Sequence, residues 1–150
     1  MPPPPPEAWQ RAALREAQER GVVTITAGTK GGRAREVPVS ERALASLERA
    51  AQAQGGDRSL VPASETWQSW REGTLREARE LVQAHTGAGL HDLRAAYACD
   101  RYEAITGHAA PVVAGERLAD RGVDREARMT IAEELGHGRI DVVSAYVGGR

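Results

Sequence analysis

The only lysine of the chain, Lys30, stands at the start of a glycine turn in the stretch VVTITAGTKGGRAREVPVS, residues 22–40; the other 19 basic residues are arginines. A lysine ammonium can release a proton when neighbouring cations lower its pKa, whereas a guanidinium stays protonated. In a phosphoryl transfer that expels an alkoxide, such an amine would protonate the leaving oxygen. The alternative is that Lys30 is an ordinary turn residue.

The motif HDLR places His91 and Arg94 three residues apart, so both side chains can point from one face at the start of a helix. There, free backbone N–H groups and the helix dipole favour an anion, and the two side chains would complete a phosphate site. Histidine and arginine at this spacing are also common on protein surfaces, so the motif alone leaves both interpretations open.

In the segment ELGHGRIDVVSAY, His137 lies between Gly136 and Gly138, and Tyr146 follows nine residues after the histidine. On an unbroken helix, this spacing places the two side chains on opposite faces. The glycines allow the chain to bend and bring both side chains to one site. The alternative is a helix that ends at Gly138 and a tyrosine that only packs through its ring.

The elements that must position these residues are mainly helical. Two segments rich in β-branched residues, 22–27 and 35–39, predict a β-hairpin around the turn at 28–34, with Pro38 placing the second strand on an edge. Helices are predicted over 9–20, 41–54 with Ser40 as N-cap, 64–84 with a break at Gly73 (Thr74 and Glu77 have capping-box spacing), 91–105, 124–135 with Asp124 as cap, and a last turn within 139–146. Residues 107–123 are predicted to be a loop. The predicted class is α+β, mainly helical with one small antiparallel sheet.

Composition limits the range of functions. Of the 150 residues, 41% are hydrophobic and 27% charged, as in soluble globular proteins, but only 4% are aromatic and phenylalanine is absent. No apolar run is long enough for a membrane span, no signal-peptide pattern is present, and the single cysteine, Cys99, excludes an intrachain disulfide. The net charge is +2 over residues 1–60 and −3 over residues 61–150, so any nucleic-acid contact must come from a local patch.

Taken together, TKGGRAREVPV, HDLRAAYA, ELGH and the tyrosine nine residues after that histidine resemble the tyrosine recombinases, also called phage-type integrases. The resemblance covers 21–150, and DREARMTIAEELGHGRIDVVSAYVG is similar to integrase-related proteins of bacterial mobile elements. It implies a tyrosine-recombinase catalytic-domain-like fold over these residues, incomplete at the N-terminus and preceded by a proline-rich lead-in and short helix at 1–20. The implied function is site-specific recombination or integration of DNA.

The resemblance also implies a role for each motif residue. Tyr146 matches the nucleophile that forms a 3′-phosphotyrosyl bond and leaves a 5′-hydroxyl, and Lys30 matches the lysine that protonates that oxygen. Arg94 matches one of two arginines that hold the non-bridging phosphate oxygens. His91 matches a histidine placed for proton exchange and phosphate contact, and His137 matches one that hydrogen-bonds the phosphate.

Partners and cofactors follow from the same resemblance. Because the covalent intermediate keeps the energy of the broken bond, no metal or other cofactor is implied. Double-stranded DNA is the expected partner, with a homo-oligomer assembled on it and neither a membrane nor a small-molecule substrate. The expected location is the bacterial cytoplasm, on the nucleoid when the chain is bound to DNA. Further DNA contacts are predicted, from position and charge, at Arg33 and Arg35 on the hairpin and at Arg139.

The sequence departs from the family at its N-terminal end. The family's other arginine stands in a G-x-R-x-x-E-like helix ahead of the hairpin, and none of Arg11, Arg15 and Arg20 lies in such a motif. The family's DNA-clamping domain is not found either, so the chain is expected to begin after both. Loss of one cation would slow cleavage about 100-fold or more.

Three functions therefore stay open: a recombinase domain, a catalytically inactive DNA-binding or regulatory remnant, and a protein-interaction module. A zinc enzyme fits poorly, because the four histidines and the cysteine are too scattered for usual ligand spacing. The remaining polar and aromatic candidates are expected to pack in the core or in a groove: Cys99, Tyr97, Tyr102, Trp67 and Trp70.

Overall fold

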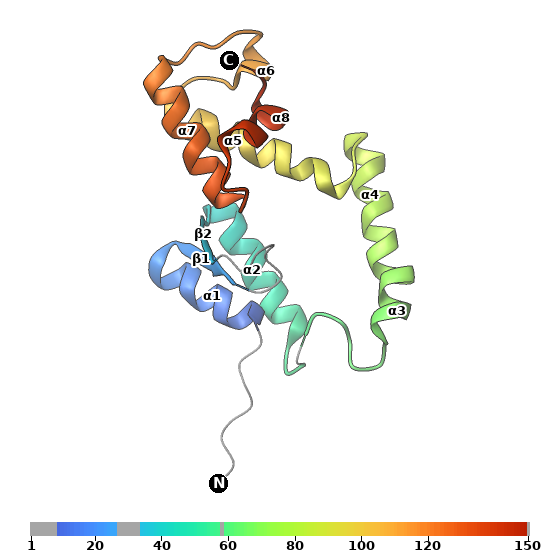
Figure 1. Ribbon diagram of the computed structural model, residues 1–150. Helices are drawn as coiled ribbons and strands as arrows, with labels where there is room; N and C mark the ends of the chain where they lie inside the picture. Colours follow the sequence, from blue (N-terminus) through green and yellow to red (C-terminus); the bar gives the residue numbers. More distant parts are fainter. Residues whose placement is uncertain (1–8, 27–33, 58, 150) are drawn as a thin grey trace. The chain divides into compact units, whose positions relative to one another are not determined.

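The computed structural model describes residues 9–26, 34–57 and 59–149, and the chain divides into two compact units (Figure 1). The first unit comprises residues 1–27 and 36–77, and the second comprises residues 28–35 and 78–150. The predicted class is confirmed, because the described elements are mostly helices with one two-stranded sheet. Lys30 and Arg33 lie outside the described residues.

The two strands follow helix α1, Trp9–Arg20, as predicted, and except for Arg35 they belong to the first unit. Strand β1 is Val22–Ile25 and strand β2 is Arg35–Pro38. The Val39 amide, just after β2, donates to the carbonyl of Gly21, just before β1, at 2.9 Å. In the two-stranded sheet of the described residues β2 lies on an edge, which is where Pro38 is tolerated.

Helix α2, Glu41–Gln54, also belongs to this unit and packs against α1 (Figure 1). The small core between these elements is built from short aliphatic side chains. Its buried members are Ala13, Ala17 and Val23, and its partly buried members are Ile25, Val39, Leu44 and Leu47.

The N-cap of α2 has the predicted geometry: the Ser40 hydroxyl oxygen accepts from the Ala43 amide at 3.2 Å. Ser40→Ala should lower the free energy of unfolding by about 0.5–2 kcal/mol, because this amide then loses its partner. Urea unfolding followed by circular dichroism measures the change. Ser40→Asp keeps an acceptor and serves as control, so equal losses in both variants would contradict the capping role.

The next helical region is continuous where a break was predicted. Helix α3, Trp67–Trp70, passes through a π-helical segment, Arg71–Leu75, into α4, Arg76–Thr86. The break expected at Gly73 is therefore wrong; the chain accommodates this glycine in a wider turn. The capping box that forms is between Thr66 and Ser69, not between Thr74 and Glu77.

The two tryptophan rings of α3 contact each other in a tilted arrangement, with ring centroids 5.6 Å apart. Trp67 is 58% exposed, so of the two predicted environments, the core or a groove, the core is wrong.

The second unit is built around α5, Leu93–Thr106, which packs against α7, Arg121–Glu134, and α8, Ser144–Val147 (Figure 1). Short 3₁₀ segments precede α5 at Leu90–Asp92 and α8 at Ile140–Val143, and α6, Pro111–Ala114, lies within the predicted loop and contacts α8. The buried core is rich in alanine, which brings the helices close: Ala98, Tyr102, Ala110, Ala119, Ala127, Ile131, Ala132, Leu135, Val143 and Val147.

Helix α7 begins earlier than predicted. The carboxylate of Asp120 accepts from the amides of Gly122 at 3.3 Å and Val123 at 3.2 Å, so Asp120 is the N-cap. Asp124, predicted to be the cap, is one turn into the helix and only 2% exposed. The prediction was wrong because either aspartate suits a cap, and only the packed structure buries the second one.

The burial of Asp124 is possible because it is paired. Arg128 Nε donates to both carboxylate oxygens at 3.1 and 3.0 Å, and the Tyr102 hydroxyl donates to Oδ1 at 2.7 Å. Burial and this hydrogen bond raise the pKa of Tyr102 to about 12. Arg128 Nη1 also donates to Ser144 Oγ at 3.1 Å and to the Gly148 carbonyl at 3.0 Å. Arg128 of the buried ion pair therefore connects α7 to α8 through hydrogen bonds.

Candidate active site

The structure brings the phenol of Tyr146 to the imidazole of His137. The two rings stack with centroids 5.9 Å apart and planes inclined by 25°, and Tyr146 Oη lies 3.4 Å from His137 Nε2. The turn between them uses the flanking glycines as predicted, with φ of +76° at Gly136 and +67° at Gly138. The backbone of Tyr146 is also fixed, because its carbonyl accepts a hydrogen bond from Cys99 Sγ at 3.4 Å.

Two guanidinium groups meet at the end of α7, one residue before that turn. Arg94 Nη2 donates to the Leu135 carbonyl at 2.6 Å, and Arg35 Nη1 donates to the same oxygen at 3.2 Å. Leu135 is the C-cap of α7, where a carbonyl lacks a helical partner and the helix dipole favours cations. Both arginines belong to the second unit, and both are half-buried.

His91 is not brought into hydrogen-bonding contact with the Tyr146 site, and Lys30 and Arg33 are not among the described residues. His91 is exposed on the 3₁₀ turn that precedes α5, so it does not share an α-helical face with Arg94. Among the described residues, no hydrogen bond joins His91 to Arg94, His137 or Tyr146. Its part in a phosphate site stays a prediction, as do the roles of Lys30 and Arg33, which lie outside the described residues.

Arg139, predicted to contact DNA, is exposed and bound to a neighbouring carboxylate. Its Nε and Nη2 donate to the two oxygens of Asp141 at 3.2 and 2.8 Å. A phosphate would therefore have to compete with this ion pair, which is open to solvent on both sides.

The surroundings of His137 disfavour its charged form. Burial lowers the pKa of the imidazole below its ordinary value of 6.5, and the nearby guanidinium groups of Arg94 and Arg35 lower it further. At neutral pH the ring is therefore uncharged, so one of its nitrogens can accept a hydrogen bond.

This lowered pKa predicts a pH dependence of stability. Above pH 6.5 His137 is neutral in both states, whereas below 6.5 the unfolded chain takes up the proton more readily than the folded one. The free energy of unfolding should therefore decrease as the pH falls from 6.5 to the folded-state pKa. Unfolding between about pH 5 and 8 compares the wild type with His137→Asn, which should lack this part of the slope. Identical profiles would contradict the prediction.

A second set of contacts holds the end of α7 against α5. The Glu134 carboxylate, 6% exposed, accepts from the Tyr97 hydroxyl at 2.7 Å and from Arg101 Nε and Nη2 at 2.7–3.1 Å. Burial and the hydrogen bond to this carboxylate raise the pKa of Tyr97. These contacts fix the residue next to Leu135, and so the carbonyl on which Arg94 and Arg35 meet.

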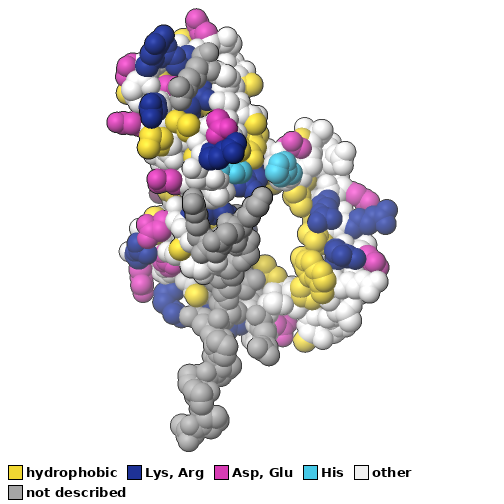
Figure 2. All heavy atoms as spheres, in the orientation of Figure 1, with side chains coloured by type: hydrophobic (Ala, Val, Ile, Leu, Met, Phe, Trp, Pro, Cys, Tyr) yellow, Lys and Arg dark blue, Asp and Glu magenta, His cyan; other side chains and the backbone are white. Residues whose placement is uncertain are grey.

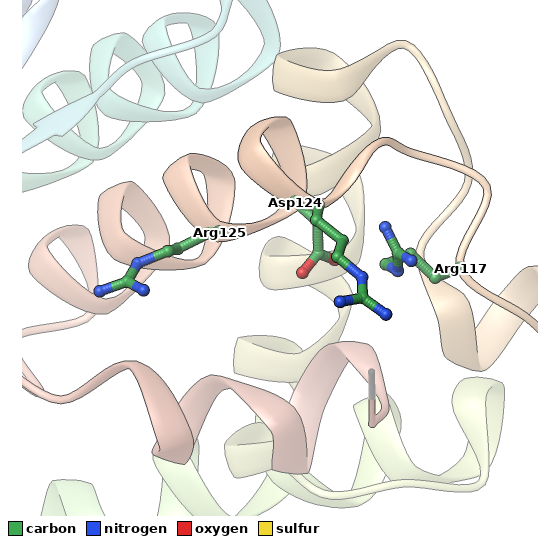
Figure 3. Close-up of a pocket in the computed structure, with 4 residues that line it drawn as sticks. Arg117, Asp124 and Arg125 are labelled. Carbon is green, nitrogen blue, oxygen red and sulfur yellow. The ribbon is translucent and has the colours of Figure 1, made fainter.

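A pocket of about 490 Å³ opens at the other end of α7, lined among the described residues by Arg117, Arg121, Asp124 and Arg125 (Figure 3). Figure 3 shows that Arg117 comes from the segment before α7, while Asp124 and Arg125 come from the helix, with Arg125 pointing along it away from the other two. Because α7 has 14 residues, the pocket is about 20 Å along the helix from the turn that carries His137. It is a separate feature from the Tyr146 site.

Charge on the molecular surface is mixed. On the face shown in Figure 2, the described residues expose both basic and acidic side chains, in agreement with the net charge of −1. Within the described ranges, no helix has the length and apolar character of a membrane span, and no group of three or more His, Cys, Asp or Glu side chains could hold a metal ion.

Comparison with known proteins places the chain in a family, through a match that ends before His137 and Tyr146. A family model described as Integrase matches residues 7–100, more than half of the chain, including the hairpin and the HDLR motif. No curated protein and no solved structure matches the chain. The chain therefore belongs to the integrase family, and its general function is that of a recombinase or integrase that acts on DNA.

Proposed function

We propose that this chain cleaves and rejoins double-stranded DNA through a covalent 3′-phosphotyrosyl intermediate on Tyr146. The observation that carries the proposal is the contact between Tyr146 Oη and His137 Nε2, 3.4 Å apart, beside the helix end that holds the Arg94 guanidinium. A phenol next to a neutral imidazole and a fixed cation is the arrangement that nucleophilic attack on a phosphodiester requires.

In the proposed reaction, Tyr146 Oη attacks the scissile phosphorus while the bond from phosphorus to the 5′ oxygen breaks. The phenol proton passes to Nε2 of His137 in the tautomer that carries its own hydrogen on Nδ1, and the lowered pKa keeps the imidazole neutral at neutral pH. The 5′ oxygen leaves with the bonding electrons and takes a proton from Lys30, the donor that the family resemblance assigns. Attack of a 5′-hydroxyl on the phosphotyrosyl bond reverses these steps and rejoins a strand.

Arg94 would stabilise the charge that grows on the non-bridging oxygens in the transition state. Its guanidinium has five N–H donors, and the described structure uses Nη2 on the Leu135 carbonyl. The other donors are available to phosphate oxygens. Such fixed donors are effective because they need no reorganisation when the charge develops.

A second candidate is a DNA-binding remnant without catalysis. The net charge of −1 agrees with a chain that binds DNA only weakly on its own. Such a protein would retain DNA through phosphate contacts and release it as salt increases. It would form no covalent bond to DNA.

Covalent capture separates the two candidates. The purified chain would be incubated with nicked duplexes of randomised sequence, and denaturing gels would show whether labelled DNA stays attached to protein. We expect an adduct that carries a 3′-linked peptide containing Tyr146 after protease digestion, identified by mass spectrometry. Salt-sensitive DNA retention without an adduct would favour the remnant, and neither retention nor adduct would contradict both.

A further inference from the structure

We propose that Arg35 supplies the second guanidinium of the phosphate site, beside Arg94. The inference rests on the proposed function and deepens it, because the family resemblance assigns this second cation to no residue of the chain. It replaces the predicted role of Arg35 as a peripheral DNA contact with direct contact to the reacting phosphate.

The first support is convergence on one atom. Arg35 lies at the start of strand β2 and Arg94 in the first turn of α5, yet both donate to the Leu135 carbonyl oxygen. Two groups that bond to one oxygen lie close together, so their remaining donors can reach the oxygens of one phosphate. Both guanidinium groups also act on His137, the residue that touches the Tyr146 hydroxyl.

The second support is the space made for Arg35. A Cβ built on Gly136 would overlap Arg35 Nη1 and approach its Cζ to 3.1 Å, so the guanidinium passes over a position that has no side chain. Arg35 Nε is buried and has no hydrogen-bond partner among the described residues. A buried donor without a partner is costly, and a bound oxyanion that re-oriented the guanidinium would relieve that cost.

The third support is the charge balance. Among the described residues, neither Arg35 nor Arg94 forms an ion pair with a carboxylate. The nearest acidic residue along the chain to Leu135, Glu134, is already bound to Arg101 and Tyr97. The site therefore carries uncompensated positive charge, which matches the two non-bridging oxygens of a phosphodiester and the charge added in its transition state.

The N-terminal arginines are engaged elsewhere. Arg11 donates to the carbonyls of Gly55 and Asp57 in the first unit. Arg20 bonds to Glu16 at 2.9 Å and to Glu36 at 2.7 Å. These contacts stabilise the hairpin and its helices, whereas those of Arg35 lead to the Tyr146 site.

Phosphate binding tests the inference without any cleavage. Inorganic phosphate would be titrated into the full chain at constant pH and ionic strength while NMR follows the His137 ring. We expect Arg35→Gln to weaken phosphate binding about 10-fold or more, because a charge-assisted hydrogen bond is lost, and Arg35→Lys to recover part of it. The control Arg71→Gln removes the same charge from an exposed helical position and should leave the affinity unchanged.

Adduct formation gives the second readout. In the capture experiment, Arg35→Gln should slow adduct formation about 100-fold. If the wild type forms no adduct but phosphate binding still depends on Arg35, the cleavage reaction is wrong and the phosphate assignment stands. Wild-type phosphate affinity in Arg35→Gln would overturn the inference. So would equal losses in Arg35→Gln and Arg35→Lys that accompany loss of the His137–Tyr146 ring contact, since Arg35 would then be only structural.

Discussion

Replacing Tyr146 by phenylalanine should abolish the covalent DNA adduct and leave the fold and the DNA retention of the chain unchanged. The change removes only the hydroxyl, whose one hydrogen bond among the described residues is the long 3.4 Å contact with His137. The ring can keep its stacking on the imidazole and its place against the core. Without the phenol oxygen, no atom at this position can attack phosphorus. Adduct yield, salt-dependent DNA retention and urea unfolding would be measured on the same samples.

Tyr97→Phe provides the matched control, because it removes a phenol hydroxyl from the same unit. That hydroxyl donates to Glu134 at 2.7 Å in a half-buried position, so its loss should lower the free energy of unfolding by about 1–3 kcal/mol. The adduct should nevertheless form. An adduct that persists in Tyr146→Phe would show that another residue is the nucleophile, and loss of the adduct in both variants would point to a general structural effect.

The local pattern of the sequence was sufficient for α1 and α2. Helices α1 and α2 have the predicted bounds because Ser40 caps the second one and Gly21 and Gly55 follow them with positive φ. The pattern failed where two residues offer the same signal. Asp120 and Asp124 both suit an N-cap, and tertiary burial beside Arg128 decides which of them is used.

The candidate site was only partly predictable, because some of its contacts depend on the fold and leave no signal in the local sequence. Arg94, His137 and Tyr146 stand in short motifs, and the glycines explain how the last two meet. The Leu135 carbonyl has no side-chain signature, because any residue could supply that oxygen. The approach of Arg35 to an oxygen 100 residues away depends on the fold and not on local spacing.

Of the contacts that support the site, some have a signal in the local sequence and others have none. The pairing of Glu134 with Arg101 and Tyr97 joins residues more than 30 positions apart, and nothing in the sequence links them. Asp124 and Arg128, by contrast, have the i, i+4 spacing of a helical ion pair. That spacing could have indicated the pair, although not its burial.

The buried pair leads to the largest expected loss of stability. Asp124→Asn removes the charge that compensates Arg128, whose side chain is 0% exposed and whose Nη2 already lacks a partner among the described residues. Leaving a buried charge unpaired costs about 3–5 kcal/mol, and we expect a decrease of that size in the free energy of unfolding, measured by urea titration. Asp141→Asn breaks an exposed ion pair and should change stability little.

A double substitution separates the cost of an unpaired charge from loss of packing. Asp124→Leu combined with Arg128→Met removes both charges and keeps apolar volume, so it should restore much of the stability lost in Asp124→Asn. It also removes the bonds from Arg128 to Ser144 and Gly148, which flank the helix of Tyr146. If those bonds position the tyrosine, the double variant should fold well and still form the adduct more slowly. A double variant as unstable as Asp124→Asn would show that packing or the lost Tyr102 hydrogen bond, and not the unpaired charge, determines the loss.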